Sequence, residues 1–118
     1  MNREIKFKVW DIQNHTMIYD NVVIHATGLV FVGDETNSRS LVIPLEFLPI
    51  YDKQNKQYCD GDIVPTSYGN LIVRFGFTKG VIGWGLYESM KAESGCALIN
   101  DEYKIIGNIY ENPELLNH

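Results

Sequence analysis

The stretch NLIVRFGFTKGVIGWGLYE, residues 70–88, decides the fold class of this chain. Apolar side chains occupy every second position from Leu71 to Phe77, which is the period of a half-buried strand. Residues 78–80 then supply Thr-Lys-Gly, a turn sequence, and a second apolar run follows from Val81 to Tyr87. Residues 70–88 therefore predict a β-hairpin.

Glycine and proline mark special points in the predicted strands. Gly83 and Gly85 fall on one face of the second hairpin strand, where another strand or an aromatic ring could approach closely. The alternating run from Leu41 to Phe47 contains Pro44, which cannot donate a ladder hydrogen bond. Pro44 predicts an edge strand or a bulge there. An exposed edge at this run could serve self-pairing by strand addition.

Strand-like alternation recurs along the chain, separated by short polar clusters, and the only helical candidate is a single turn at residues 88–93. This pattern predicts an all-β protein built of small barrels or rolls. The sequence Gly-Asp-Ile-Val at 61–64 is typical of the first strand of an SH3-like barrel. We therefore expect an SH3-like β-barrel over residues 51–118, closed by a strand from Tyr103 to Tyr110 and ending in a short turn and tail. Residues 1–50 are predicted to form an N-terminal β unit packed on it.

Composition narrows the functional classes. The 118 residues contain 45 % hydrophobic and 21 % charged residues, as ordinary globular proteins do. Apolar stretches are too short to cross a bilayer, and no signal peptide is seen, so we expect a cytoplasmic protein without membrane contact. The net charge of −5 argues against non-specific nucleic-acid binding, which needs clustered Lys and Arg.

No catalytic or metal-binding constellation is evident. The three histidines are not tied to a shared site: His15, His25 and His118. Asp60 and Asp62 flank a glycine, but they are better explained as turn formers than as ligands of a cation. Cys59 and Cys96 lack metal-type spacing and are expected to be structural thiols in a reducing compartment. We therefore expect a protein that is not an enzyme and needs no cofactor.

Two surfaces are candidates for binding. Lys6, Lys8 and Trp10 share one face of the first strand, which would combine phosphate contacts with a stacking ring in a nucleic-acid-binding regulator. The simpler interpretation is a solvated strand face whose tryptophan caps the edge of the core.

Aromatic side chains suggest the second surface. Tyr68, Trp84 and Tyr87 could form an aromatic face for peptides, as in SH3-like grooves. The alternative is that these rings pack inside a small barrel, because large aromatic side chains fill such cores.

Three blocks of the sequence resemble the YopX family of small phage and prophage proteins. They are residues 3–11, which end in Trp-Asp, residues 51–64, which lead into Gly-Asp-Ile-Val, and residues 103–116, which contain Gly-Asn-Ile-Tyr-Glu-Asn-Pro. The family usually has Thr-Gly-Leu where this chain has residues 48–50, and Gly in the turn where this chain has Asn55. Since Asn tolerates a left-handed backbone, we expect that turn to form.

The resemblance implies a phage or prophage origin, a fold that includes an SH3-like barrel, and self-association. It implies no catalytic residues. The hypothesis is a phage or prophage accessory protein of unknown biochemical activity that acts as a non-catalytic interaction module toward a host or phage protein. The alternative is a nucleic-acid-binding regulatory protein.

Overall fold

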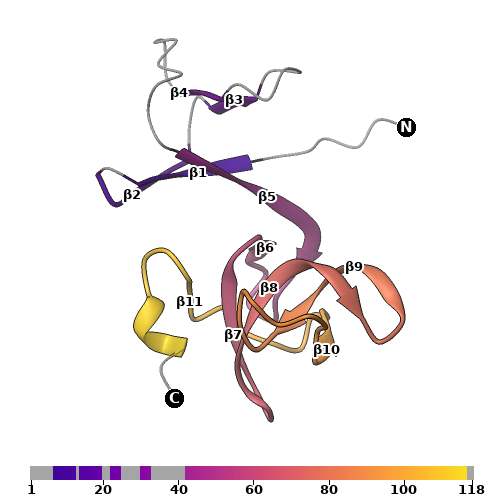
Figure 1. Ribbon diagram of the computed structural model, residues 1–118. Coiled ribbons are helices and arrows are strands. Elements are labelled where there is room, and N and C mark those ends of the chain that lie inside the picture. The colour runs from indigo at the N-terminus through magenta and orange to yellow at the C-terminus, as the bar shows by residue number, and fades with distance from the viewer. Residues whose placement is uncertain (1–6, 13, 20–21, 25–29, 33–41, 117–118) are drawn as a thin grey trace. The chain divides into compact units, whose positions relative to one another are not determined.

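A computed structural model describes residues 7–12, 14–19, 22–24, 30–32 and 42–116 (Figure 1). The predicted all-β class is confirmed. The elements in chain order are β1 (Phe7–Asp11), β2 (Thr16–Ile18), β3 (Val22–Ile24), β4 (Val30–Val32), β5 (Val42–Tyr51), β6 (Gln57–Cys59), β7 (Asp62–Thr66), β8 (Gly69–Thr78), β9 (Val81–Tyr87), β10 (Ala97–Leu98), β11 (Gly107–Asn108) and the 3-10 helix η1 (Pro113–Leu116). The chain divides into two compact units, Met1–Phe47 and Leu48–His118.

In the first unit, β1 pairs antiparallel with β2 and with β5, and β3 pairs with β4. The ladder between β1 and β5 runs through Pro44, which lies opposite Val9, without a break in register. The bulge expected as one alternative at Pro44 is therefore wrong. An antiparallel ladder alternates between bonded and non-bonded pairs, so a residue whose N–H points away from its partner strand can be proline.

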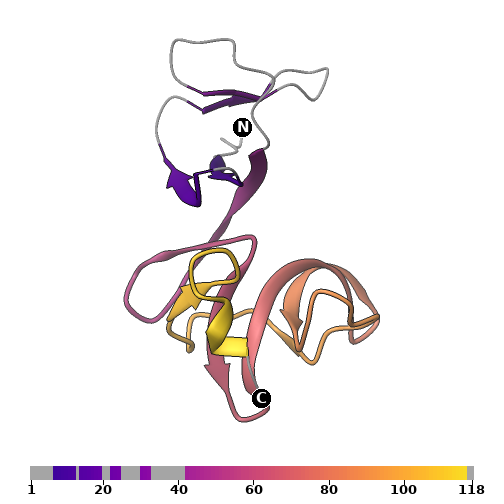
Figure 2. The same ribbon diagram turned by 60° about the vertical axis from the view of Figure 1, so that its left-hand side comes forward.

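In the second unit, a five-stranded antiparallel sheet has the order β10-β9-β8-β7-β11. Its strands curl together, as both views show (Figures 1 and 2). One face of this sheet covers a core of buried side chains: Leu48, Tyr58, Val64, Leu71, Val73, Leu86 and Ile105. Closure of the sheet as an SH3-like barrel, and the packing of the two units on each other, remain predictions.

The predicted hairpin is confirmed as β8 and β9, whose ladder runs from Ile72 opposite Tyr87 to Thr78 opposite Val81. Lys79 and Gly80 connect the strands with φ values of 48° and 83°, as in a type I′ turn. The right-handed twist of this turn matches that of the flanking strands, which explains why two residues suffice.

The hairpin curls back toward its own base, and glycines make room for this. A Cβ atom at Gly85 would overlap the Thr78 hydroxyl, and one at Gly76 would overlap the Tyr87 hydroxyl. Gly85 thus permits a close approach as expected, but the approaching group is the Thr78 side chain and not an aromatic ring. At Gly83, a side chain would meet open space instead.

Asp52 fixes the loop that follows β5. One carboxylate oxygen accepts hydrogen bonds from the backbone N–H groups of Gln54 (2.9 Å) and Lys56 (2.8 Å), and the other accepts one from Ile105 (2.9 Å). Burial alone would raise the pKa of Asp52, but these hydrogen bonds and the charge of Lys56 together hold it below its usual value. Asn55 has a φ of 63°, so the turn forms with Asn in the left-handed region, as expected.

The C-terminal block is held by Asn108 and not by a long strand. Its side-chain oxygen accepts the N–H groups of Tyr110 (3.0 Å) and Glu111 (2.8 Å), and its amide donates to the Glu111 carboxylate (2.8 Å). These bonds turn the chain, so the strand expected from Tyr103 to Tyr110 is limited to β11. Residues beyond the turn form η1, where the Leu115 carbonyl accepts a hydrogen bond from Asn70 on β8 (2.8 Å).

Candidate interaction surface

The hairpin carries apolar side chains on a face that is open to solvent. Phe75 and Phe77 on β8 lie opposite Trp84 and Ile82 on β9. Their exposed fractions are 58 % for Phe75, 50 % for Phe77 and 76 % for Ile82, while Trp84 is half-buried. We call the surface formed by Phe75, Phe77, Ile82 and Trp84 the hairpin face.

The side chains of the hairpin face lie on the same side of β8 and β9 as buried core side chains. Val73 and Leu86 are paired across the same two strands, point to the same side by strand alternation, and are fully buried. The next pair, Phe75 and Trp84, packs edge to face with ring centroids 5.6 Å apart, and Trp84 also packs against the core. The row of apolar side chains on this side of the hairpin is therefore buried near the core and exposed toward the tip of the hairpin.

Near its base, the opposite side of the hairpin is closed by polar contacts, which tie β8 to β9 and to the segment that follows β9. The Arg74 guanidinium lies 4.1 Å from the centre of the Tyr87 ring and donates to the carbonyls of Ser89 (2.9 Å) and Ala92 (3.0 Å). The Thr78 hydroxyl donates to the Tyr87 hydroxyl at 3.2 Å, and both side chains are buried. Binding at the hairpin face would thus need little ordering of the backbone, which lowers the entropy cost of association.

The chemistry of the hairpin face is that of an apolar contact. Its four side chains include no ionisable group and hold no nucleophile or base. Contiguous exposed apolar side chains of this kind mark protein-contact sites in soluble proteins, and Trp is enriched among the residues that dominate binding energy.

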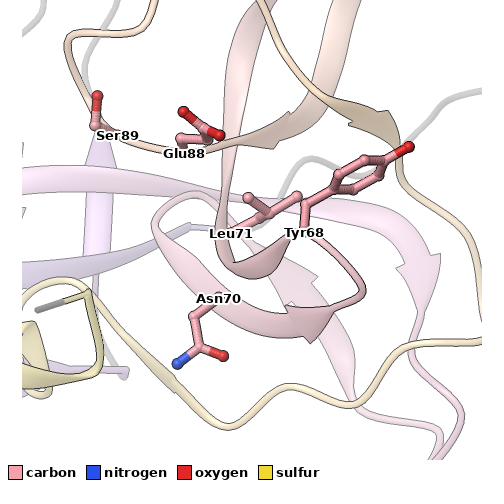
Figure 3. A pocket seen from close by; sticks show the side chains of 5 residues that line it. All are labelled: Tyr68, Asn70, Leu71, Glu88 and Ser89. Atoms are coloured by element: carbon pink, nitrogen blue, oxygen red, sulfur yellow. The ribbon is translucent and has the colours of Figure 1, made fainter. Parts of the chain in front are cut away.

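A separate shallow depression of about 320 Å³ lies at the opposite end of β8 (Figure 3). Tyr68 and Leu71 line one side of it and Glu88 and Ser89 the other, with Asn70 below. The Asn70 amide is engaged with the Leu115 carbonyl, so it is part of the scaffold. The depression is lined by one carboxylate, from Glu88, and by two hydroxyl-bearing side chains, from Tyr68 and Ser89.

The face predicted for nucleic-acid binding is largely buried. Lys8 and Trp10 are only 6 % and 5 % exposed, so the expectation of a solvated strand face is wrong for Lys8, whereas the burial of Trp10 agrees with a tryptophan that caps the edge of the core. The Lys8 ammonium lies over the rings of Tyr19 and Phe47, at 5.6 Å and 5.7 Å from their centroids. Both faces of β1 are covered there, which period-two alternation alone cannot reveal. Lys6 lies outside the described residues.

The predicted aromatic surface is not formed as a unit. Tyr87 is fully buried, Trp84 is half-buried in the hairpin face, and Tyr68 is exposed at the turn between β7 and β8. Phe75, Phe77 and Ile82 were not predicted as surface residues, because alternation assigned the two phenylalanines to a core. The signal was strand length: β8 has 10 residues, well beyond the usual five or six, so its end can extend past the core.

The remaining candidates have structural roles in the described part of the chain. The Asp62 carboxylate accepts the N–H of Cys59 at 2.7 Å, as expected of a turn former. Cys59 is buried and Cys96 half-buried, and neither takes part in a disulfide. No group of three or more potential metal ligands occurs among the described residues, and none of their helices is long and apolar enough to cross a membrane.

Comparison with known proteins identifies the family. The family model described as YopX protein matches residues 6–117. The crystal structure of protein EF1440 from Enterococcus faecalis is similar, with 20 % sequence identity, a TM-score of 0.63, and coverage of 98 % of this chain and 100 % of that chain. At this identity the likeness concerns the fold alone. No curated protein matches significantly. Because the family match spans nearly the whole sequence, the chain belongs to the YopX family.

Proposed function

We propose that this YopX-family chain is a phage or prophage accessory protein that acts in the host cytoplasm as a non-catalytic interaction module. The hairpin face binds another protein of the host or the phage. The observation that carries the proposal is the exposure of Phe75, Phe77 and Ile82 on a stripe continuous with the core. Leaving such side chains in water is unfavourable, and covering the exposed parts of each contributes roughly 1–2 kcal/mol to association.

A binding role without catalysis is supported by the chemistry of the described surface. The depression beside Tyr68 contains Glu88 as its carboxylate, and the Ser89 hydroxyl accepts an N–H from Lys91 at 3.2 Å. Nucleophilic catalysis needs a base hydrogen-bonded to the nucleophile, and the hydrogen bond described for the Ser89 hydroxyl is to the Lys91 backbone N–H and not to the Glu88 carboxylate. Burial of Lys8 and Trp10 argues against nucleic-acid binding through these two side chains.

The test is an affinity capture from phage-bearing host lysate, run with and without nuclease. The wild-type chain is compared with a Phe75→Ser, Phe77→Ser double variant and with a Met90→Ser, Leu98→Ser control. Met90 and Leu98 are about as exposed as Phe77 but lie outside the hairpin face. We expect a nuclease-resistant protein partner that the double variant loses at least tenfold and the control retains. Retention by all three, or loss of the material on nuclease treatment, would overturn the proposal.

A further inference from the structure

The depression at the far end of β8 has an uncompensated carboxylate at its rim (Figure 3). Glu88 is exposed, and its carboxylate makes no hydrogen bond or ion pair with any residue that the structure describes. No lysine, arginine or histidine lines the depression. Arg74 contacts the same segment, but its guanidinium lies over the Tyr87 ring and donates to the Ser89 carbonyl. The Glu88 carboxylate is therefore available to a cation from outside the chain.

An exposed aromatic ring lines the same depression. Tyr68 is 64 % exposed, so most of its ring is open to a ligand. The face of an aromatic ring attracts a cation, and a neighbouring carboxylate attracts the same charge. The net charge of −5 of the whole chain acts in the same direction. Charge and ring together favour a cationic ligand over an anionic or an apolar one.

The backbone that carries these groups is held in place by the chain itself. The Tyr68 N–H donates to the Thr66 hydroxyl at 3.0 Å, and that hydroxyl donates to the Gly69 carbonyl at 2.8 Å. On the other side, the Ser89 hydroxyl accepts the Lys91 N–H at 3.2 Å. Both sides of the depression are thus ordered before a ligand arrives, which lowers the entropy cost of binding.

We propose that this depression binds a guanidinium group, the side chain of an arginine on another protein. A planar guanidinium can stack on the Tyr68 ring and still donate in its own plane to the Glu88 carboxylate. The second lone pair of the Ser89 hydroxyl can accept a further N–H. An ammonium group is a point charge and cannot stack, so arginine fits this set of groups better than lysine.

The dimensions of the depression indicate a side chain of a protein and not a free small molecule. Its volume of about 320 Å³ is at the lower end of the range for ligand sites, and it is shallow. It can therefore cover only the end of one side chain, and the affinity of that contact alone is low. Further contacts must hold the ligand in place, and the surface around an arginine in a protein supplies them.

This inference goes beyond the proposed function and does not depend on it. The proposed function uses Phe75 and Phe77 near the tip of the hairpin, whereas the depression lies at the opposite end of β8. The Phe75→Ser, Phe77→Ser variant should therefore bind an arginine peptide as the wild type does. The test uses a synthetic peptide, so it can succeed or fail whether or not a partner is captured.

The first experiment is a nuclear magnetic resonance titration of the full chain, labelled with ¹⁵N, with the peptide acetyl-Gly-Arg-Gly-amide. We expect saturable shifts at the amides of Tyr68, Glu88 and Ser89. The same peptide with citrulline, which has the shape of arginine without its charge, should bind roughly fivefold more weakly, and the lysine peptide should also bind more weakly. Equal binding of the citrulline or lysine peptide, or no saturable shift at these residues, would overturn the proposal.

The second experiment repeats the titration with variants of the depression. Glu88→Gln and Tyr68→Leu should each weaken binding of the arginine peptide by roughly two- to fivefold. Glu102→Gln is the matched control, because Glu102 is an exposed carboxylate of the same unit outside the depression, and it should bind as the wild type does. Unchanged affinity in Glu88→Gln or Tyr68→Leu, or an equal loss in Glu102→Gln, would contradict the site.

Propylguanidine separates the two sources of the cation, because it carries a guanidinium without a polypeptide. We expect it to bind no more tightly than the arginine peptide, since the depression covers only the end of the side chain. Binding of propylguanidine that is roughly tenfold tighter than that of the peptide would identify a free guanidino compound as the ligand and overturn the assignment to a protein side chain.

Discussion

Replacing Asp52 with alanine should lower the free energy of unfolding of the second unit by about 3 kcal/mol. The largest part comes from Ile105, whose N–H is buried and donates to the Asp52 carboxylate at 2.9 Å. Leaving that group unsatisfied costs roughly 1–3 kcal/mol. The N–H groups of Gln54 and Lys56 belong to exposed residues, where water can replace the carboxylate, so their loss adds only about 0.5–1 kcal/mol each.

The assay is urea unfolding followed by circular dichroism and tryptophan fluorescence. With a slope of about 1–3 kcal/mol/M, the expected loss moves the midpoint down by roughly 1–3 M. Asp101→Ala is the matched control, because Asp101 is exposed in the same unit, and it should stay within about 0.5 kcal/mol of wild type. If Asp52→Ala were as stable as this control, the three hydrogen bonds could not be what fixes the loop.

The Asp52 carboxylate also makes the free energy of unfolding depend on pH. The folded state holds the pKa of Asp52 below its usual value, because hydrogen bonds from Ile105, Lys56 and Gln54 outweigh the effect of burial. Its stabilisation is therefore complete above the unfolded-state pKa, about 3.9, and is lost as the pH falls through the lower folded-state pKa. Asp52→Asn should flatten the stability curve below about pH 4. An unchanged acid dependence in Asp52→Asn would show that other groups control it.

Three further predictions use the same unfolding measurement. Gly76→Ala should lower the free energy of unfolding by about 1–3 kcal/mol, because the added Cβ atom would overlap the buried Tyr87 hydroxyl. Gly83→Ala should raise it by about 0.5–1 kcal/mol in the monomer, because a Cβ atom there meets open space. Equal effects of the two variants would contradict the curl of the hairpin. Asn108→Ala should lower the free energy of unfolding by about 2 kcal/mol, because the backbone N–H groups of Tyr110 and Glu111 lose their acceptor. An unchanged free energy would mean that the C-terminal turn forms without the Asn108 side chain. Lys79→Asn should raise the free energy of unfolding by up to about 1 kcal/mol, because the Asn-Gly sequence suits the positive φ values of the turn. A lower free energy of unfolding would contradict the type I′ geometry.

The strands were largely predictable, because alternation depends on the local sequence. The hairpin of β8 and β9, its turn and the role of Asn55 follow from period two and from residues that tolerate positive φ. The length of the closing strand was not predictable in this way. The sequence of residues 103–110 is apolar enough for a strand, but hydrogen bonds from the backbone to Asn108 end it at two residues.

The exposed surface was less predictable, because exposure depends on tertiary structure. Alternation shows which side chains share a face but not how far the core reaches along that face. Phe75 and Phe77 share a face with Leu71 and Val73, yet the first two are exposed and the last two are buried. On β1, Lys8 sits on the face expected to be solvated but is covered by aromatic side chains.

Site-specific photo-crosslinking at position 77 tests most directly whether the hairpin face binds protein. Phe77 is half exposed, so a photoreactive phenylalanine analogue placed there should leave the fold intact. Irradiation of phage-bearing host cells should yield protein adducts at position 77 and far fewer at Tyr51, an aromatic residue of similar exposure outside the hairpin face. Adducts at position 51 alone, or nucleic-acid adducts at position 77, would contradict the central claim.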